Sequence, residues 1–402
     1  MRSFRLLIMI FLVLAILLFT AIAMAEQGVT DKEIVIGMST ALSGPASILG
    51  TSFKSGVELY LDEVNSGGGV YGRKIKLIAY DDQYEPTNAV AQVKTLDRTD
   101  RIFCLLGDVG TPTALAIKPI LDEQKIPLFA PFTGAASLRV PVDRYIFNYR
   151  ASYDQEAETF VQGMVDVLRY DKIAVFYQDD GYGKAVLEGT KLALKKRGLN
   201  PVATGAYTRN YEDIIPAMET IMAEKPQAVV MAGTYSACAR FIRVWKRKVI
   251  LAGNPKNLDP VFMNVSFVGP EPLAALLENY GNGVVVTQVV PPYSQGDANF
   301  AAVKEYLSIL GRHGYPTPPN AVSLEGYLAT KVFVEILRRN GKNLTRESFI
   351  QTAEATRNLD IQAGNRISFS HENHQGSQFV YPTLIQNGVF VPLSDWRAVK
   401  SK

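Results

Sequence analysis

The chain has little histidine and little cysteine, the residues that hold many catalytic metals and serve as many nucleophiles. Only three histidines and two cysteines occur among its 402 residues. His371 and His374 have the spacing of a metal-binding pair, but no third ligand cluster accompanies them. We interpret that segment as a polar loop, and we expect neither a metal nor another cofactor.

Motifs of the common nucleotide-binding and hydrolytic enzymes are also missing. There is no GxGxxG after the first predicted strand, no P-loop and no GxSxG elbow. The carboxylate pairs Asp81-Asp82 and Asp179-Asp180 lie beside predicted turns, where acidic residues commonly cap helices. The sequence therefore predicts a protein that is not an enzyme.

The chain lacks a marked excess of either charge. Lys and Arg total 42, against 39 for Asp and Glu. Such a balance provides no electrostatic footprint for nucleic acid. The one basic cluster, Arg243 to Lys248, is interpreted as a solvated helix face. We expect no nucleic-acid partner.

The cysteines, Cys104 and Cys238, are too few for a disulfide framework. Cys104 lies in the apolar run RIFCLLG, and Cys238 lies near a predicted helix start in TYSACARFI. An exported protein could oxidise such a pair, but sequence alone does not bring the two sulfurs together. We expect two buried free thiols.

Residues 1–25 have the pattern of an export signal. Arg2 and Arg5 precede an apolar run, and Ala23-Met24-Ala25 supplies the small residues of a cleavage site. The alternative is an uncleaved membrane anchor, because the run approaches the roughly 20 residues that span a bilayer. No later stretch is as long and apolar, and no cysteine lies near the cleavage site. We therefore expect a cleaved signal peptide and a soluble protein in a Gram-negative periplasm.

Short apolar runs alternate with longer segments at helical spacing along the rest of the chain. This alternation is typical of βαβ units, in which helices cover both faces of a parallel sheet. Pro86, Pro112 and Tyr182-Gly183 mark predicted helix starts. The apolar runs are IVIGM, KIKLIAY, RIFCLLG, PLFAPF, KIAVFYQ, PQAVVMAG and GVVVTQVV.

The same layout of strand, polar loop, helix, turn and strand begins again near Lys172. Roughly 375 residues follow the predicted signal, a length that suits two domains in one chain. No Pro-rich linker or low-complexity segment separates the halves. The sequence predicts two α/β lobes joined by short strands, a geometry that permits a hinge.

Eight segments in order resemble the type I periplasmic binding proteins, specifically the branched-chain amino acid (Leu/Ile/Val) binding family of ABC importers. The resemblance covers almost the whole chain after the signal. Each segment is weak evidence alone, but eight in order behind an export signal are strong. They are LSGPASILG at 42–50, GGVYGRKI at 68–75, YDD at 80–82, LLGDVGTPTALA at 105–116, FAPFTGAAS at 129–137, AVFYQDDGYGKA at 174–185, VVMAGTYSACA at 229–239 and FMNVSFVG at 262–269.

The resemblance implies two doubly wound parallel-sheet lobes with a three-crossover hinge, closing on a ligand like a Venus flytrap. Lobe 1 would comprise residues 29–148 plus 289–362, and lobe 2 residues 149–288 plus 363–396. It also implies a membrane permease and an ATPase as partners. We expect a monomer.

The first lobe offers groups that suit a ligand carboxylate. Ligands of open parallel sheets bind beyond the carboxyl ends of the strands, where helix N-termini present free N–H groups. The hydroxyls of Thr111 and Thr133, with the backbone around Gly134 and Ala135, could bind a carboxylate, and Ser43 is a further candidate. The alternative is that these hydroxyls only cap their own helices.

The second lobe offers aromatic closure of the cleft. The resemblance places Tyr182 on a ligand tyrosine of the family and Tyr235 within one residue of another, and Tyr153 is a weaker candidate. Tyrosine can both stack on a ligand and donate a hydrogen bond. The alternative is a rim tyrosine that packs only on its own lobe.

One position departs from the family pattern. Amino acid binders of the family place an acidic residue near 262–269, where it pairs with the ligand's ammonium group, whereas this chain has Ser266 there. A buried ammonium needs a compensating partner. Asp154, Asp179 or Asp180 would have to supply it, or the ligand is not an α-amino acid.

Two functions follow from these features. The first is the substrate-binding component of an ABC importer, which captures a small amino acid or related carboxylate and delivers it to a membrane permease. The alternative is a sensing protein that binds an amide, urea or an aromatic or aliphatic acid and reports to a separate receptor.

Overall fold

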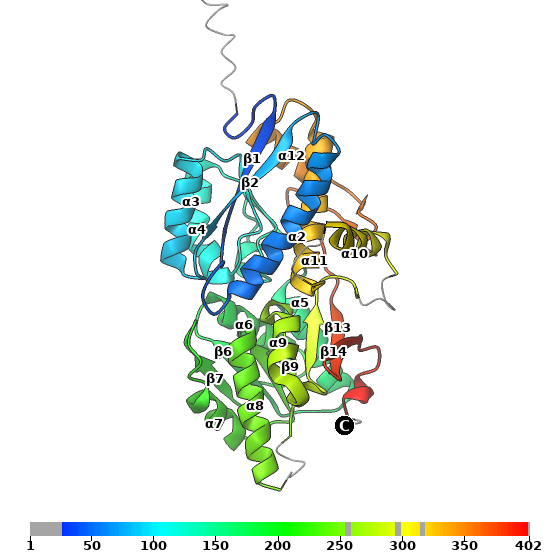
Figure 1. The fold of residues 1–402 in the computed structure, drawn as a ribbon. Helices are drawn as coiled ribbons and strands as arrows, with labels where there is room; N and C mark the ends of the chain where they lie inside the picture. The colour runs from blue at the N-terminus through cyan, green and yellow to red at the C-terminus, as the bar shows by residue number, and fades with distance from the viewer. Residues whose placement is uncertain (1–25, 254–258, 294–298, 314–317, 401–402) are drawn as a thin grey trace, which may run out of the picture.

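The computed structural model describes residues 26–253, 259–293, 299–313 and 318–400. The predicted export signal, residues 1–25, lies outside the described residues. Within the described ranges, no helix has the length and apolar character that a membrane crossing requires. Two lobes lie end to end, each with its own central sheet (Figure 1).

The first lobe contains a five-stranded sheet in the order β2-β1-β3-β4-β5, and every pair of neighbouring strands is parallel. A parallel doubly wound sheet is what the sequence predicted. The strands are β1 (Glu33–Thr40), β2 (Lys74–Asp81), β3 (Cys104–Leu106), β4 (Leu128–Phe129) and β5 (Ile146–Phe147).

Helices cover both faces of this sheet because successive strand residues point in opposite directions. Leu105 and Leu128 join a core cluster with the helices on one face, and their neighbours Leu106 and Phe129 join the cluster on the other. The first face carries α3 (Pro86–Arg98) and α4 (Thr111–Gln124). The second carries α2 (Ser47–Ser66), α11 (Ala321–Asn340) and α12 (Arg346–Glu354), and α10 (Ala301–His313) lies beside α11 (Figure 1).

The second lobe contains a seven-stranded sheet in the order β14-β13-β10-β9-β8-β6-β7. Its strands are β6 (Ile173–Gln178), β7 (Thr204–Tyr207), β8 (Ala228–Ala232), β9 (Val261–Asn264), β10 (Val285–Gln288), β13 (Tyr381–Gln386) and β14 (Val389–Pro392). Five strands are parallel, but β13 and β14 are antiparallel additions at one edge. The sequence did not predict this hairpin. Its helices are α5 (Tyr153–Val161), α6 (Gly181–Lys195), α7 (Ile215–Ala223), α8 (Tyr235–Leu251) and α9 (Pro270–Leu277).

The chain passes between the lobes after β5, after β10 and before β13, which agrees with a three-crossover hinge. After the small hairpin of β11 (Leu359–Asp360) and β12 (Arg366–Ile367), Phe369 and His374 pack on Phe147 of β5. This packing puts the chain up to His374 against β5 of lobe 1, and the assignment of residues 363–396 to lobe 2 stays a prediction. The other lobe boundaries stay predictions.

Two smaller expectations concern single side chains. Cys104 and Cys238 are buried and free, as expected. His374 is buried rather than part of a polar loop, because only 2% of its side-chain surface is exposed. Its ring stacks on that of Phe147, and the two ring centroids are 3.9 Å apart. His371 is exposed. No group of three or more histidine, cysteine or acidic residues with metal-binding geometry occurs among the described residues.

Candidate functional site

Two threonine hydroxyls meet at the carboxyl ends of β3 and β4. Thr111 begins α4, Thr133 follows β4, and their Oγ1 atoms lie 2.6 Å apart with both side chains fully buried. Thr111 is not a helix cap, because the N-cap is Gly110, whose φ of 110° suits glycine. Ala135 N donates to Thr133 Oγ1 at 3.2 Å. The capping interpretation therefore fails for Thr111, and the pair is positioned by two neighbouring parallel strands.

Two tyrosines of the second lobe lie beside each other at the starts of α5 and α6. The ring centroids of Tyr153 and Tyr182 are 5.4 Å apart, and both rings are fully buried. Tyr153 N donates to Gly134 O at 2.7 Å, which joins the tyrosine pair to the Thr133 loop. A Cβ atom at Gly134 would lie 2.5 Å from Tyr153 Cδ1, so only glycine fits there.

The hydroxyls of the two tyrosines differ in their partners. Tyr182 donates to Gly233 O at 3.3 Å. Tyr153 Oη is buried beside Thr133 and Gly134, whose groups interact with it, and burial raises the pKa of this phenol to about 12. Thr133 and Gly134 act on the phenol oxygen as donors, so the phenol proton is available to a ligand oxygen. We call Thr111, Thr133, Tyr153 and Tyr182 the interlobe site.

Local chemistry explains why Tyr182 is held at its position. Asp180 is the N-cap of α6, and its Oδ1 accepts from Tyr182 N at 2.9 Å and Gly183 N at 3.4 Å. Gly181 lies against α4, since a Cβ atom there would lie 3.1 Å from Leu115 Cδ1 and 3.5 Å from Thr111 Cγ2. The starts of α4 and α6 thus face each other across the lobes.

Two candidate residues lie apart from the interlobe site. Ser43 is exposed, and its Oγ donates to Asp81 Oδ2 at 2.5 Å, so the structure does not bring it to the threonines. Tyr235 begins α8 and is 6% exposed. It lies near Gly269, which contacts Leu49 of α2, and therefore stands where the two lobes meet.

Ser266 belongs to a buried charged network that the sequence did not reveal. Arg150, fully buried after β5, donates to Ser266 Oγ and lies 3.4 Å from Glu156 Oε1. Glu156 Oε2 accepts from Ser266 N at 2.7 Å and from Thr287 Oγ1 at 2.5 Å. Glu325 of α11 lies 3.7 Å from Arg150 Nη1. We call Arg150, Glu156, Ser266 and Glu325 the hinge network.

The hinge network carries two carboxyl groups around one guanidinium. Burial opposes the charge of Arg150, but Glu325 and Glu156 raise its pKa above the ordinary value. Burial raises the pKa of Glu325 to about 7. One carboxyl group is therefore balanced by Arg150, and the other is poised to lose or gain a proton near neutrality.

Glu156 lies beside Ser266, where the family pattern has an acidic residue. None of the three aspartates proposed from the sequence does so. Asp179 pairs with Lys184 at 3.0 Å in an exposed position, and Asp180 caps α6. Asp154 lies against α6, 2.7 Å from the Cβ atom that Gly189 would carry. Nothing in the sequence singled out Glu156, because its hydrogen bond with Ser266 joins residues that are 110 positions apart in the chain.

Aromatic rings fill the space between the lobes around Phe267. Phe267 lies in the single 3-10 turn Ser266–Val268, and its ring centroid is 4.5 Å from that of Tyr182. It is 5.3 Å from Phe132 and 5.9 Å from Tyr84, both of the first lobe. A cavity bordered by Phe132, Ser266 and Glu325 has only about 10 Å³. The described lobes are thus closed, and a ligand must separate them to reach the interlobe site.

The chain is similar to known proteins in both sequence and fold. Residues 33–388 match the model of the periplasmic binding protein family. "Leu/Ile/Val-binding protein homolog 7" of Brucella melitensis is 25% identical over 384 residues, which cover 90% of each chain.

Two solved structures are similar over nearly their full length. The crystal structure of "a possible leucine/isoleucine/valine-binding protein" from Rhodopirellula baltica is 32% identical, with a TM-score of 0.85, and the match covers 92% of this chain and 98% of that one. A "branched chain amino acid ABC transporter" from Thermus thermophilus, solved with bound valine, has a TM-score of 0.78 at 20% identity, covering 93% of this chain and 100% of that one.

These relatives are binding proteins rather than enzymes, in agreement with the sequence prediction. The fold, the parallel sheets and the matched length agree with the resemblance found in the sequence. The chain belongs to the periplasmic binding protein family.

Proposed function

We propose that this protein is the substrate-binding component of an ABC importer, which closes around a small amino acid or related carboxylate and delivers it to a membrane permease. The observation that carries the proposal is the buried meeting of Thr111 and Thr133 of one lobe with Tyr153 and Tyr182 of the other. Hydroxyl and backbone N–H donors there can bind a carboxylate without a cationic side chain.

The hinge network supports an amino acid over a simple acid. Glu156 and Glu325 lie beside Arg150, and the buried Arg139 also acts on both carboxyl groups, so the site holds acidic groups that an ammonium group can pair with. The relatives named for leucine, isoleucine and valine are consistent with such a ligand. The proposed ligand therefore has its carboxylate at the threonines and its ammonium toward Glu325.

A thermal-shift screen tests the ligand class. A ligand that binds only the folded state raises the melting temperature with its concentration. We expect aliphatic and aromatic amino acids to raise the melting temperature more than the matching amines, which lack the carboxylate. A screen in which only amides, urea or other compounds without a carboxylate stabilise the protein would overturn the proposal.

Uptake measurements test the role in import. Deleting the gene should abolish high-affinity uptake of the ligand found in the screen, and restoring it should restore uptake. Normal uptake combined with a lost transcriptional response to the ligand would instead identify the sensing protein, and would refute import.

A further inference from the structure

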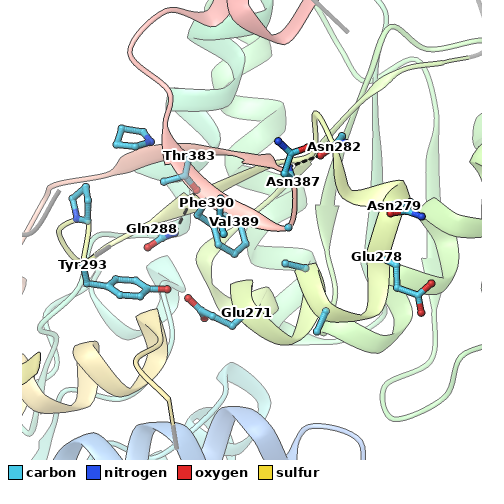
Figure 2. Close-up of a pocket in the computed structure, with 15 residues that line it drawn as sticks. Glu271, Glu278, Asn279, Asn282, Gln288, Tyr293, Thr383, Asn387, Val389 and Phe390 are labelled. Atoms are coloured by element: carbon cyan, nitrogen blue, oxygen red, sulfur yellow. Dashed lines mark hydrogen bonds between the residues drawn. The ribbon is translucent and has the colours of Figure 1, made fainter. Parts of the chain in front are cut away.

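A second and larger cavity lies in lobe 2, apart from the interlobe site. It has a volume of about 680 Å³ and lies between α9 and the β13–β14 hairpin, beside the chain that leaves β10 (Figure 2). We call it the α9 cavity. Its volume falls within the range of ordinary small-molecule sites, about 300 to 1,000 Å³. Its polar and charged lining residues are Glu271, Glu278, Asn279, Asn282, Gln288, Tyr293, Thr383 and Asn387.

The charge of the α9 cavity has one sign. Glu271 and Glu278 both line it, and no lysine, arginine or histidine is among the described lining residues. The remaining polar groups are amides, a hydroxyl and a phenol, which are neutral and can accept hydrogen bonds. A concave surface with only negative charge attracts cations and disfavours carboxylates. The ligand of this cavity must therefore differ from that of the interlobe site.

Glu271 provides a specific anchor for a cation. Its Oε1 accepts from Ala321 N at 3.1 Å, and its Oε2 is buried with no hydrogen bond to another residue in the described part of the chain. Burial raises the pKa of this carboxyl group to about 7, although its own backbone N–H and that of Ala321 lower it. Figure 2 shows this carboxylate and the phenol of Tyr293 pointing toward each other in the cavity. A buried carboxylate oxygen without a donor is costly, and an ammonium N–H would satisfy it.

The rest of the lining suits an apolar body attached to that ammonium. Ala274, Val389 and Phe390 line the cavity together with Tyr293. Aromatic faces attract organic cations, and alkyl side chains favour apolar groups. From this combination we infer that the α9 cavity binds a small organic molecule with a protonated primary amine, its ammonium on Glu271 and its apolar body against Val389 and Phe390.

Calorimetry with 2-phenylethylamine hydrochloride tests this inference on the full mature protein. We expect saturable binding with one site, and at least tenfold weaker binding of 2-phenylethanol, which has the same body without the charge. A trimethylated analogue, which cannot donate to Oε2, should also bind at least tenfold more weakly. Equal binding of the alcohol, or no binding of the amine at concentrations up to about 10 mM, would overturn the inference.

Matched variants locate the binding event. Glu271→Gln should weaken amine binding at least tenfold, and Glu278→Gln, at an exposed acid of the same cavity, by less than about threefold. Ala275→Arg puts a cation into the cavity from an exposed helix position, leaves Glu271 untouched, and should also weaken binding. If Glu271→Gln folds and binds the amine normally, the inference fails.

A further variant separates this cavity from the interlobe site. Thr133→Val, which alters the interlobe site, should bind the amine as the wild type does, and a saturating cleft ligand should not compete with it. Loss of amine binding in Thr133→Val would place the amine between the lobes and overturn the inference. The outcome is independent of the proposed function, because the amino acid and amine assays use different ligands and different variants.

Discussion

Arg209 of the second lobe donates from Nη2 to Glu85 Oε2 of the first lobe over 2.9 Å. Asn210, the next residue, donates to Glu85 Oε1 at 2.7 Å. Arg209 is also held within its own lobe by Asp180 at 3.1 Å. Both oxygens of Glu85 thus bind the second lobe, and these contacts exist only while the lobes are closed.

Replacing Glu85 with Ala should therefore favour the open arrangement. The pair is partly exposed, with side-chain exposures of 20% for Arg209 and 38% for Glu85, so we expect a loss of about 1 kcal/mol or less. Ligand affinity should fall by about fivefold or less, and small-angle scattering of the unliganded protein should show a larger radius of gyration. Lys184→Gln, which breaks an exposed pair inside lobe 2, is the control. Unchanged affinity and scattering in Glu85→Ala would contradict this link.

Glu156 should matter far more for stability than a surface acid. Its removal by Glu156→Ala leaves Ser266 N without its acceptor and Arg150 with Glu325 as its remaining acidic neighbour. Breaking a buried ion pair from one side typically costs about 3 to 5 kcal/mol. Urea denaturation should show a loss of this size, whereas Glu188→Ala, in an exposed pair with Lys191, should cost less than about 0.5 kcal/mol. A loss below about 1 kcal/mol in Glu156→Ala would be incompatible with the hinge network.

Local chemistry explains which parts of the fold could be predicted. The helices predicted at Pro86, Thr111-Pro112 and Tyr182-Gly183 are α3, α4 and α6, because their start signals act within a few residues. The β13–β14 hairpin was not predicted, since the choice between a parallel and an antiparallel edge strand depends on tertiary contacts.

The candidate site also contains residues that could be paired from the sequence and residues that could not. Thr111 and Thr133 could be paired in advance, because adjacent parallel strands end at the same edge of a sheet. The hinge network could not, since Arg150, Ser266 and Glu325 come from three distant segments. A loop serine such as Ser43 has the same sequence signal whether it faces a ligand or, as here, a neighbouring Asp81.

The interlobe site can be tested residue by residue against any ligand found in the screen. Thr133→Val removes a buried hydroxyl at nearly constant volume, and Tyr182→Ala removes a ring packed between Tyr153 and Phe267. Each should weaken binding by about tenfold or more, which corresponds to about 1.4 kcal/mol. Ser43→Ala, exposed and bound to Asp81, should change affinity by less than about twofold. Isothermal titration provides the dissociation constants, and normal affinity in both Thr133→Val and Tyr182→Ala would exclude this site.

Asp82 provides a test of stability against pH. It is fully buried, and burial raises its pKa to about 6 although Ser39 Oγ and Tyr84 N donate to it, each at 2.8 Å. Because this pKa exceeds the ordinary 3.8, the folded state holds the proton more tightly than the unfolded chain does. Its contribution to stability is therefore greatest below about pH 4 and falls as the pH rises to about 6, by up to roughly 3 kcal/mol.

Asp82→Asn removes this titration and keeps one acceptor for Tyr84 N and one donor for Ser39 Oγ. Relative to the wild type, the variant should gain stability between about pH 4 and pH 6 and keep a constant advantage above that range. Urea denaturation at a series of pH values measures the difference directly. Burial and the charge of Asp82 both raise the pKa of Asp108, so the pH-dependent difference reports the titration of this coupled pair. A difference between the two proteins that does not vary with pH would show that Asp82 stays in one protonation state throughout, which its burial beside Asp81 and Glu85 argues against.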